Sequence, residues 1–496
     1  MTATSLSAPP SPLPPRVDAA ALADAGRNPT VPFRIAAGDG CELVVEQLLR
    51  VLPGKRVVGK GHWVGAQGPA LLIKLFIDRH SARHWQREHE GIAALAAAGI
   101  PTPRALDARP LPGGGHLLLT EFLAPARTVL DAWRPLAARP PGDADVVALL
   151  TPVFALLGRV HAAGLSHDDL HFGNFLHHGE GDARRLLLID GDAVRTHAEK
   201  PLVEKFAARD LAMLTAQLPR TWLVDPAHMT PLFDAYVAAN PRPPAPAALQ
   251  RALAVEQLWR LRDYLAKTGR DCSLFKVTRS LGRYTAVLRS EAETLAPLLA
   301  DPDRYLEDGV ALKRGNTCTV ARVDIGGRTL VVKRYNLKNW RHALSRAWRP
   351  SRAAHSWREG HRLRLFGIPT PAPLALVEER RGPLRGRAWL ITEHCAGPDL
   401  LQHLDPERVP PAAEAAALRR LFALLHRERL SHGDLKATNL LWDEGEVKLI
   451  DLDAMQQHRD AASHARAWRR DRRRLLQNWP QGSDLQRWLD LNLPPA

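Results

Sequence analysis

The stretch that decides the fold is LSHGDLKATNLLWDEGEVKLIDLDAM, at Leu430–Met455. It holds the pattern H-x-D-L-x-x-x-N, followed by an apolar segment and the pair I-D. An earlier stretch, LSHDDLHFGNFLHHGEGDARRLLLIDGDAV at Leu165–Val194, repeats the same order. The polar residues of the pattern are His167, Asp169, Asn174 and Asp190 in the earlier copy and His432, Asp434, Asn439 and Asp451 in the later copy. The chain therefore carries one chemical pattern twice.

The pattern is typical of phosphoryl transfer from ATP. That reaction needs oxygen ligands for Mg²⁺, a cation on the phosphates and a carboxylate that orients the attacking hydroxyl. We predict Asp169 and Asp434 as the catalytic carboxylates. The predicted metal ligands are Asn174, Asp190, Asn439 and Asp451. The alternative is purely structural, with Asp169 and Asp434 as caps and the two I-D pairs as the ends of buried strands.

Each copy is preceded by the same series of segments. A region rich in predicted strands and turn glycines ends on an apolar strand with one lysine, Lys74 or Lys333. A predicted helix follows and stops at an identical GIPTP, at Gly99–Pro103 and at Gly367–Pro371. The repeated order indicates an internal duplication. We predict a disordered leader over 1–30 and two domains, over 31–300 and 301–496.

The helix after each lysine is expected to offer a glutamate that pairs with it and so positions it for ATP. In the first copy Glu88 fits by its distance from GIPTP, and Glu90 is a rival. In the second copy Ser356 stands at the place of Glu88, and Glu359 lies about one helical turn further on. We therefore predict Glu88 and Glu359 as cofactor-binding residues, together with Lys74, Lys333 and Lys436.

The rest of the composition restricts the class of protein. Lysine and arginine outnumber aspartate and glutamate, 68 to 53, for a formal net charge of +15, which suggests an anionic partner or an arginine-rich composition bias. The four cysteines stand at scattered positions without a C-x-x-C pair, which argues against a zinc site or a disulfide framework and favours the cytoplasm. No apolar run is long enough to predict a membrane span.

With these motifs in place, the chain resembles the bacterial lipopolysaccharide core kinases, the family of heptose and Kdo kinases, over roughly residues 45–215 and 310–480. The segments that carry the resemblance are LPGKR at Leu52–Arg56, GIPTP, SHGDL and RRDRRRLLQNW at Arg469–Trp479. The resemblance implies an α+β fold of two tandem protein-kinase-like bilobal domains. Each domain would have a small antiparallel β-rich N-lobe and a mainly helical C-lobe.

The resemblance also implies a function. It is ATP- and Mg²⁺-dependent phosphorylation of a sugar hydroxyl, of heptose or Kdo in the lipopolysaccharide inner core, with a core precursor or another sugar as partner. The reaction would take place in the cytoplasm or at the inner face of the inner membrane. The arginine-rich segment 466–474 is interpreted either as a basic helix on an anionic leaflet or as a solvated face whose Trp468 and Leu475 pack inside the domain. Asp210 and Asp471 are expected to brace the two H-x-D loops.

Two alternatives stay open. In the first alternative, one copy is a non-catalytic pseudokinase that acts as a scaffold. The motifs do not say which copy this is: the second has Lys436 but a doubtful glutamate, whereas the first has Glu88 but His171 in place of the lysine. Alternatively the chain is a small-molecule phosphotransferase of the aminoglycoside or choline type, to which HDDLHFGN is closer. The sequence lacks an A-P-E segment, so a protein substrate is not expected. Nucleic-acid binding rests on charge alone, so no nucleic acid is expected.

Overall fold

The computed structural model describes residues 13–66, 68–197, 200–336, 350–382 and 384–495. The chain divides into two compact units. The first unit comprises Met1–Leu218 and Ala227–Glu256, and the second comprises Pro219–Pro226 and Gln257–Ala496. Each unit has its own antiparallel sheet and its own helices, and they are described separately below.

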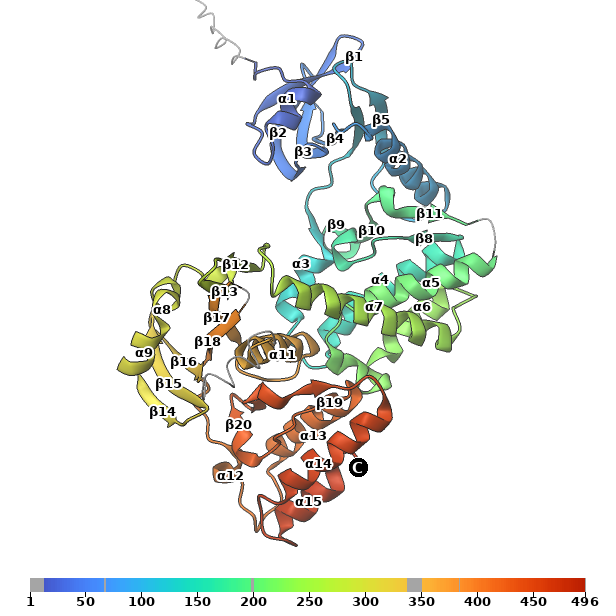
Figure 1. The fold of residues 1–496 in the computed structure, drawn as a ribbon. Coiled ribbons are helices and arrows are strands. Elements are labelled where there is room, and N and C mark those ends of the chain that lie inside the picture. The colour runs from blue at the N-terminus through green and yellow to red at the C-terminus, as the bar shows by residue number, and fades with distance from the viewer. Residues whose placement is uncertain (1–12, 67, 198–199, 337–349, 383, 496) are drawn as a thin grey trace, which may run out of the picture. The chain divides into compact units, whose positions relative to one another are not determined.

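The first unit begins with a six-stranded antiparallel sheet in the order β1-β2-β3-β4-β6-β5. Its strands are β1 (Phe33–Gly38), β2 (Cys41–Leu52), β3 (Arg56–Trp63), β4 (Leu71–Phe76), β5 (Ala105–Pro110) and β6 (His116–Glu121). Alternate residues of β1 and β4 are buried, as expected for strands with one face on a core. Helix α2 (Ser81–Ala97) packs against β4, β5 and β6 (Figure 1).

The helical part of the first unit follows the sheet. Its longer helices are α4 (Ala144–Ala162), α5 (Lys200–Thr215), α6 (Thr230–Ala239) and the start of α7 (Pro246–Lys267). Among the described residues, α4 alone is long and apolar enough to cross a membrane. Its residues Val153, Phe154 and Leu157 are fully buried, and the helix packs on α6, so it serves as the core helix of this unit.

Short strands and hairpins hold the H-x-D loop of the first unit. Strand β8 (Leu165–His167) pairs with β11 (Val194–Thr196). Strand β9 (Phe175–His178) pairs with both β10 (Arg185–Leu188) and β7 (Ala126–Thr128). The hairpin β9–β10 explains how Asn174 and Asp190, at its two ends, come together.

The second unit begins with a seven-stranded antiparallel sheet in the order β12-β13-β17-β18-β16-β15-β14. Its strands are β12 (Phe275–Arg279), β13 (Arg283–Leu288), β14 (Val310–Arg314), β15 (Cys318–Ile325), β16 (Arg328–Tyr335), β17 (Pro373–Arg381) and β18 (Leu384–Glu393). Helix α11 (Arg352–Phe366) packs against β16, β17 and β18. Helices α8 (Ala296–Ala300) and α9 (Pro302–Asp308) precede β14.

The domain boundary differs from the one expected at 300/301. Strands β12 and β13 lie before that point but belong to the second sheet, because β13 pairs with β17 from Arg283↔Glu379 to Val287↔Ala375. Phe275 and Ala286 on these strands are fully buried. The sequence predicts this stretch as the end of the first domain, because two short strands give only a weak alternation of apolar and polar residues.

The expected disordered leader over 1–30 is also corrected in part. Residues 1–12 lie outside the described residues. Beyond them, Arg16 forms a β-bridge to Arg34, and helix α1 (Ala19–Asp24) begins at Asp18, whose side chain accepts a hydrogen bond from the Ala21 backbone N–H. Leu22 is buried in the core of the first sheet. The proline-rich composition concealed this short helix.

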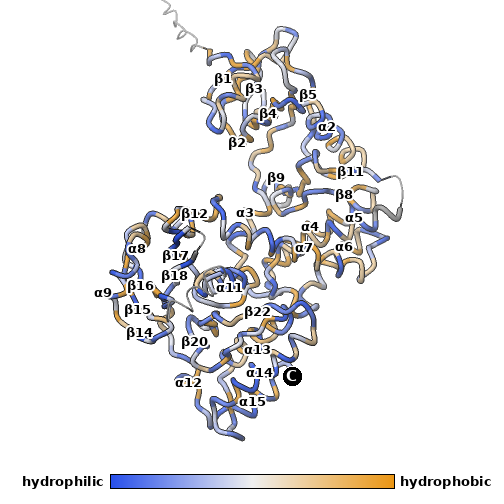
Figure 2. The backbone as a smooth tube through the Cα atoms, in the orientation of Figure 1, coloured by the Kyte–Doolittle hydropathy of each residue, from blue (hydrophilic) through white to orange (hydrophobic). Residues whose placement is uncertain are grey.

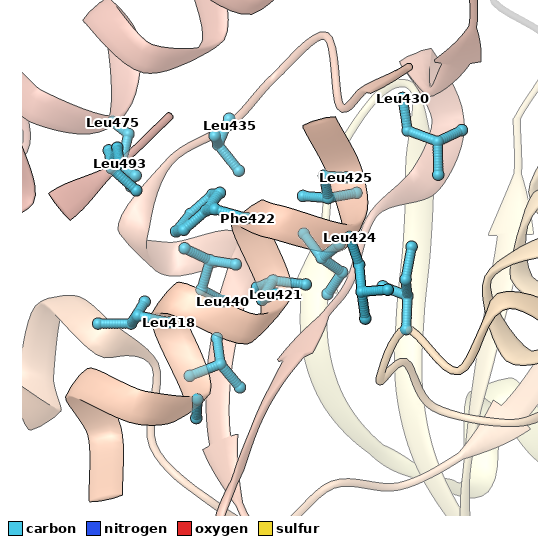
Figure 3. Close-up of a cluster of buried hydrophobic side chains, with 14 of the residues drawn as sticks. Leu418, Leu421, Phe422, Leu424, Leu425, Leu430, Leu435, Leu440, Leu475 and Leu493 are labelled. Carbon is cyan, nitrogen blue, oxygen red and sulfur yellow. The ribbon is translucent and has the colours of Figure 1, made fainter. Parts of the chain in front are cut away.

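The helical part of the second unit is a leucine-rich core. It contains α12 (Leu400–His403), α13 (Ala412–Arg427), α14 (Ala461–Leu476) and α15 (Asp484–Asn492). Figure 3 shows Leu421, Phe422 and Leu425 of α13 among the buried side chains of this core, together with Leu435 and Leu440 from the H-x-D loop and the strand after it. The loop is therefore anchored by its own apolar residues on the helix that precedes it.

Helix α14 contains the arginine-rich segment 466–474, and the structure shows where the two large apolar residues of this helix lie. Trp468 and Leu475 are buried in the core of the second unit, so they offer no apolar face to a membrane. The helix as a whole is rich in hydrophilic residues (Figure 2). Its exposed arginines are Arg466, Arg469, Arg470, Arg473 and Arg474.

Candidate active site in each unit

In the first unit the strand lysine and the helix glutamate form a buried ion pair. The Lys74 ammonium on β4 contacts Glu88 Oε1 on α2, and Arg56 Nη1 on β3 lies 3.4 Å from Glu88 Oε2. The Glu88 side chain is fully buried. Burial alone would raise the pKa of Glu88, but Lys74 and then Arg56 outweigh it and lower the pKa below its usual value. The rival Glu90 is exposed and bonds Gln86 on its own helix.

Helix α2 also touches the loop that carries Asp190. A Cβ atom on Gly91 would lie 2.0 Å from the Gly191 carbonyl oxygen, so only glycine permits this approach of the two backbones. Arg87, on the same helix, donates to the Asp192 carbonyl at 2.9 Å and pairs with its carboxylate at 3.1 Å. The helix that supplies Glu88 is thus fixed against the segment that supplies a predicted metal ligand.

The H-x-D loop of the first unit is held by backbone and side-chain hydrogen bonds. The His167 backbone N–H donates to Asp210 Oδ2 at 2.7 Å, and Asp210 on α5 is fully buried. Asn174 Nδ2 donates to the Asp169 carbonyl at 2.9 Å. Asp190 has a left-handed backbone, with φ of 75°. The expected brace by Asp210 is confirmed, and the carboxylate of Asp169 is left exposed.

The second unit repeats these bonds at its own residues. The His432 backbone N–H donates to Asp471 Oδ2 at 2.6 Å, which confirms the second brace. Asn439 Nδ2 donates to the Asp434 carbonyl at 2.9 Å. Asp451 is left-handed, with φ of 59°. The shared motif therefore adopts one local geometry in both units.

The surroundings of the loop aspartate differ between the units. In the second unit Lys436 Nζ lies 2.9 Å from Asp434 Oδ2, and Arg474 of α14 pairs with Oδ1. In the first unit His171 stands at the place of Lys436. Burial lowers the pKa of His171, so its imidazole is neutral at neutral pH. The second unit thus concentrates more positive charge beside its loop aspartate.

The lysine of the second unit has different partners from those expected. Lys333 Nζ lies 2.6 Å from Asp451 Oδ1 and 3.2 Å from Asp453 Oδ2. Asp453 stands two residues beyond the I-D pair and not on the preceding helix, where the sequence predicts the partner of the lysine. The signal that could have found it is the repeated I-D-x-D, which places a second carboxylate beside the first.

The prediction that Glu359 pairs with Lys333 is wrong. Glu359 is buried but pairs with Arg362 Nη1 at 2.8 Å on its own helix. Burial raises the pKa of Glu359 above its usual value despite this arginine. Ser356 occupies the place of Glu88, and its hydroxyl donates to Asp453, which in turn pairs with the lysine.

The predicted metal ligands suit magnesium in number and type. Each unit places one carboxylate, Asp190 or Asp451, and one amide, Asn174 or Asn439, at the two ends of a hairpin. Magnesium is usually held by one or two carboxylates together with substrate phosphates. Within the described ranges there is no cluster of three or more His, Cys, Asp or Glu side chains that would form an all-protein metal cage. The donor set therefore fits a metal that arrives with a nucleotide.

The model of the Lipopolysaccharide kinase (Kdo/WaaP) family matches residues 57–235 and 302–488. The chain belongs to this family. It is therefore a kinase-like phosphotransferase with a protein-kinase-like α+β fold. The two matched segments fall on the two copies of the motif.

Individual relatives are more distant. The chain is 37% identical over 73 residues to the serine/threonine-protein kinase KIC1 of Saccharomyces cerevisiae, which is 14% of this chain and 7% of that kinase. A structure of WaaP in complex with acyl carrier protein is 24% identical, with a TM-score of 0.30, over 44% of this chain and 86% of that one. The PknI kinase domain of Mycobacterium tuberculosis is 20% identical, with a TM-score of 0.29, over 43% and 95%.

Proposed function

We propose that the chain is an ATP- and Mg²⁺-dependent sugar kinase built from two tandem protein-kinase-like domains. The observation that carries the proposal is the repeated loop geometry. In each unit the loop asparagine bonds the carbonyl of the loop aspartate at 2.9 Å, and a left-handed aspartate follows the next hairpin. An arrangement kept twice in one chain, down to single hydrogen bonds, supports two sites for the same chemistry.

The residues take the following roles in this proposal. Asp169 and Asp434 orient the acceptor hydroxyl and accept its proton as the oxygen attacks the terminal phosphoryl group. Asn174, Asp190, Asn439 and Asp451 hold magnesium, which neutralises charge on the phosphates when it is bound. Lys74 and Lys333 contact the phosphates. Lys436 adds a cation near the transferred group in the second domain.

The acceptor we propose is a sugar hydroxyl of the lipopolysaccharide inner core, on heptose or Kdo. Family membership supports this class of substrate. The net charge of +15 and the exposed arginines of α14 suit an acidic glycolipid, because anionic groups are attracted to such a surface. Such a substrate would be met at the cytoplasmic face of the inner membrane.

A second candidate function is supported by one observation. Both oxygens of Asp434 are engaged by cations, Lys436 and Arg474, whereas the Asp169 carboxylate is exposed. An aspartate held in this way has neither carboxylate oxygen free to receive an acceptor hydroxyl. In this alternative the second domain binds or scaffolds without transferring phosphate, and the first domain is the kinase.

The acceptor class is tested by transfer of labelled γ-phosphate to a panel of acceptors. The panel holds a heptose–Kdo core glycolipid, its dephosphorylated form, an aminoglycoside and choline. We expect label on the glycolipid, and about 10²–10⁴-fold slower labelling when the Asp169→Ala/Asp434→Ala variant replaces the wild-type protein, which excludes a contaminating kinase. Labelling of the aminoglycoside or choline alone would contradict the assignment and favour a small-molecule phosphotransferase.

A further inference from the structure

Asp453 is the most heavily hydrogen-bonded carboxylate beside the proposed nucleotide site of the second unit. Its Oδ1 accepts from the Tyr335 hydroxyl at 2.5 Å and from the Ser356 hydroxyl at 2.7 Å. Its Oδ2 lies 2.5 Å from Arg352 Nη2 and 3.2 Å from Lys333 Nζ. The Asp453 side chain is only 9% exposed. Four donors from β16 and α11 therefore fix this carboxylate in one place.

In the first unit the carboxylate that holds the lysine comes from the helix and not from the loop after the hairpin. There the helix supplies the carboxylate, Glu88, and the lysine pairs with it directly. Asp192, the counterpart of Asp453, pairs instead with Arg87 at 3.1 Å and His84 at 3.5 Å on the outer part of α2. In the second unit the helix supplies the donors, Ser356 and Arg352, and the loop after the hairpin supplies the acceptor.

Two differences in sequence between the units accompany this exchange of donor and acceptor. Ser356 stands where Glu88 stands in the first unit, at the same distance from GIPTP. Tyr335 stands two residues after the lysine, where the first unit has Phe76. A phenylalanine cannot donate a hydrogen bond to a carboxylate, whereas the Tyr335 hydroxyl donates one to Asp453 Oδ1. The two changes act together, because each one adds a hydrogen bond to the same carboxylate.

We propose that Asp453 replaces the missing helix glutamate and positions Lys333 for the phosphates of ATP, so that the second domain keeps a working nucleotide site. Asp451, the other partner of Lys333, is the proposed metal ligand of this domain and would turn towards the metal. Asp453 is then the carboxylate that still holds the lysine. It is a positioning residue, and this inference rests on the proposed function of the second domain.

The test measures binding rather than turnover, with the full chain and a non-hydrolysable ATP analogue plus Mg²⁺ in a calorimeter. Lys74→Ala removes the first site, so that the second site is titrated alone. We expect Asp453→Asn in that background to weaken binding by about tenfold or more, since breaking a buried ion pair is costly. The matched control is Asp484→Asn in the same Lys74→Ala background, which is expected to leave the second site's affinity unchanged because Asp484 pairs with Arg487 on the exposed side of α15.

A rebuilt variant separates positioning from folding. Tyr335→Phe, Ser356→Glu and Asp453→Asn together give Lys333 a helix glutamate at the place of Glu88 and are expected to recover the affinity lost in Asp453→Asn. Unchanged affinity in Asp453→Asn would overturn the inference and leave the second site intact. A loss of affinity that the rebuilt variant does not recover would also overturn the inference, because it would show that Asp453 has only a structural role. Absence of any site in the Lys74→Ala chain would overturn the proposed function of the second domain as well.

Discussion

Replacing Asp169 and Asp434 together by alanine is expected to lower the rate of phosphoryl transfer by about 10²–10⁴-fold, the usual contribution of a positioned acid–base group. The affinity for Mg-ATP should change little, because neither aspartate is a proposed metal or phosphate ligand. The measurement is transfer of labelled γ-phosphate to the core glycolipid at saturating ATP, with ATP binding measured in parallel.

The single variants divide the activity between the domains. If both domains transfer phosphate, Asp169→Ala and Asp434→Ala each leave the turnover of the other domain. If the second domain is a scaffold, Asp434→Ala leaves the rate unchanged and Asp169→Ala removes it. Asp168→Asn is the matched control, since Asp168 is on the same loop but pairs with Arg195 and Arg209. Full activity of the double variant would contradict the proposed catalytic roles.

Glu88→Ala should produce the largest loss of stability in the first unit, about 3–5 kcal/mol in the free energy of unfolding. The change leaves Lys74 and Arg56, only 15% and 16% exposed, without the carboxylate that compensates their charge. Chemical unfolding followed by circular dichroism measures the loss, and Mg-ATP affinity at the first site should fall with it. Glu90→Ala on the exposed side of α2 is the control and should change neither quantity.

The same ion pair gives the first unit a defined dependence on pH. The pKa of Glu88 is lower in the folded protein than in the unfolded chain, because Lys74 and Arg56 outweigh the effect of burial. Its contribution to stability is therefore complete above the unfolded pKa of about 4.5 and is lost as pH falls through the folded value. Glu88→Ala should flatten this acid limb of the unfolding profile. An unchanged acid limb would show that Glu88 does not carry it.

Local sequence patterns predicted those residues of the candidate site whose type and spacing along the chain are both fixed by the motif. The H-x-D loops, the strand lysines and Glu88 were found because each must stand at a fixed distance from a recognisable turn or strand. Glu88 was separated from Glu90 only by the structure, since both lie on one helix within two residues of each other. Which of them faces the sheet depends on how the helix packs, and here α2 packs closely on the Asp190 loop at Gly91 and Gly191.

The features that sequence reasoning missed depend on contacts between distant segments. Asp453 lies 120 residues from Lys333, and its choice over a helix glutamate depends on Tyr335 and Ser356 acting together. Strands β12 and β13 were missed because their place in the second sheet comes from pairing with β17, far along the chain. The repeated I-D-x-D marks Asp453 as a candidate, but its pairing with Lys333, like the pairing of β13 with β17, depends on contacts between distant segments.

The central claim is that the chain holds two nucleotide sites of one kind. It is tested most directly by calorimetric titration of Mg-ATP into wild type, Lys74→Ala and Lys333→Ala. We expect two sites in wild type and one in each variant, because each lysine lies in a separate unit beside its own loop and hairpin. A single site in wild type, lost in one variant and untouched in the other, would contradict the claim and identify the remaining unit as a scaffold.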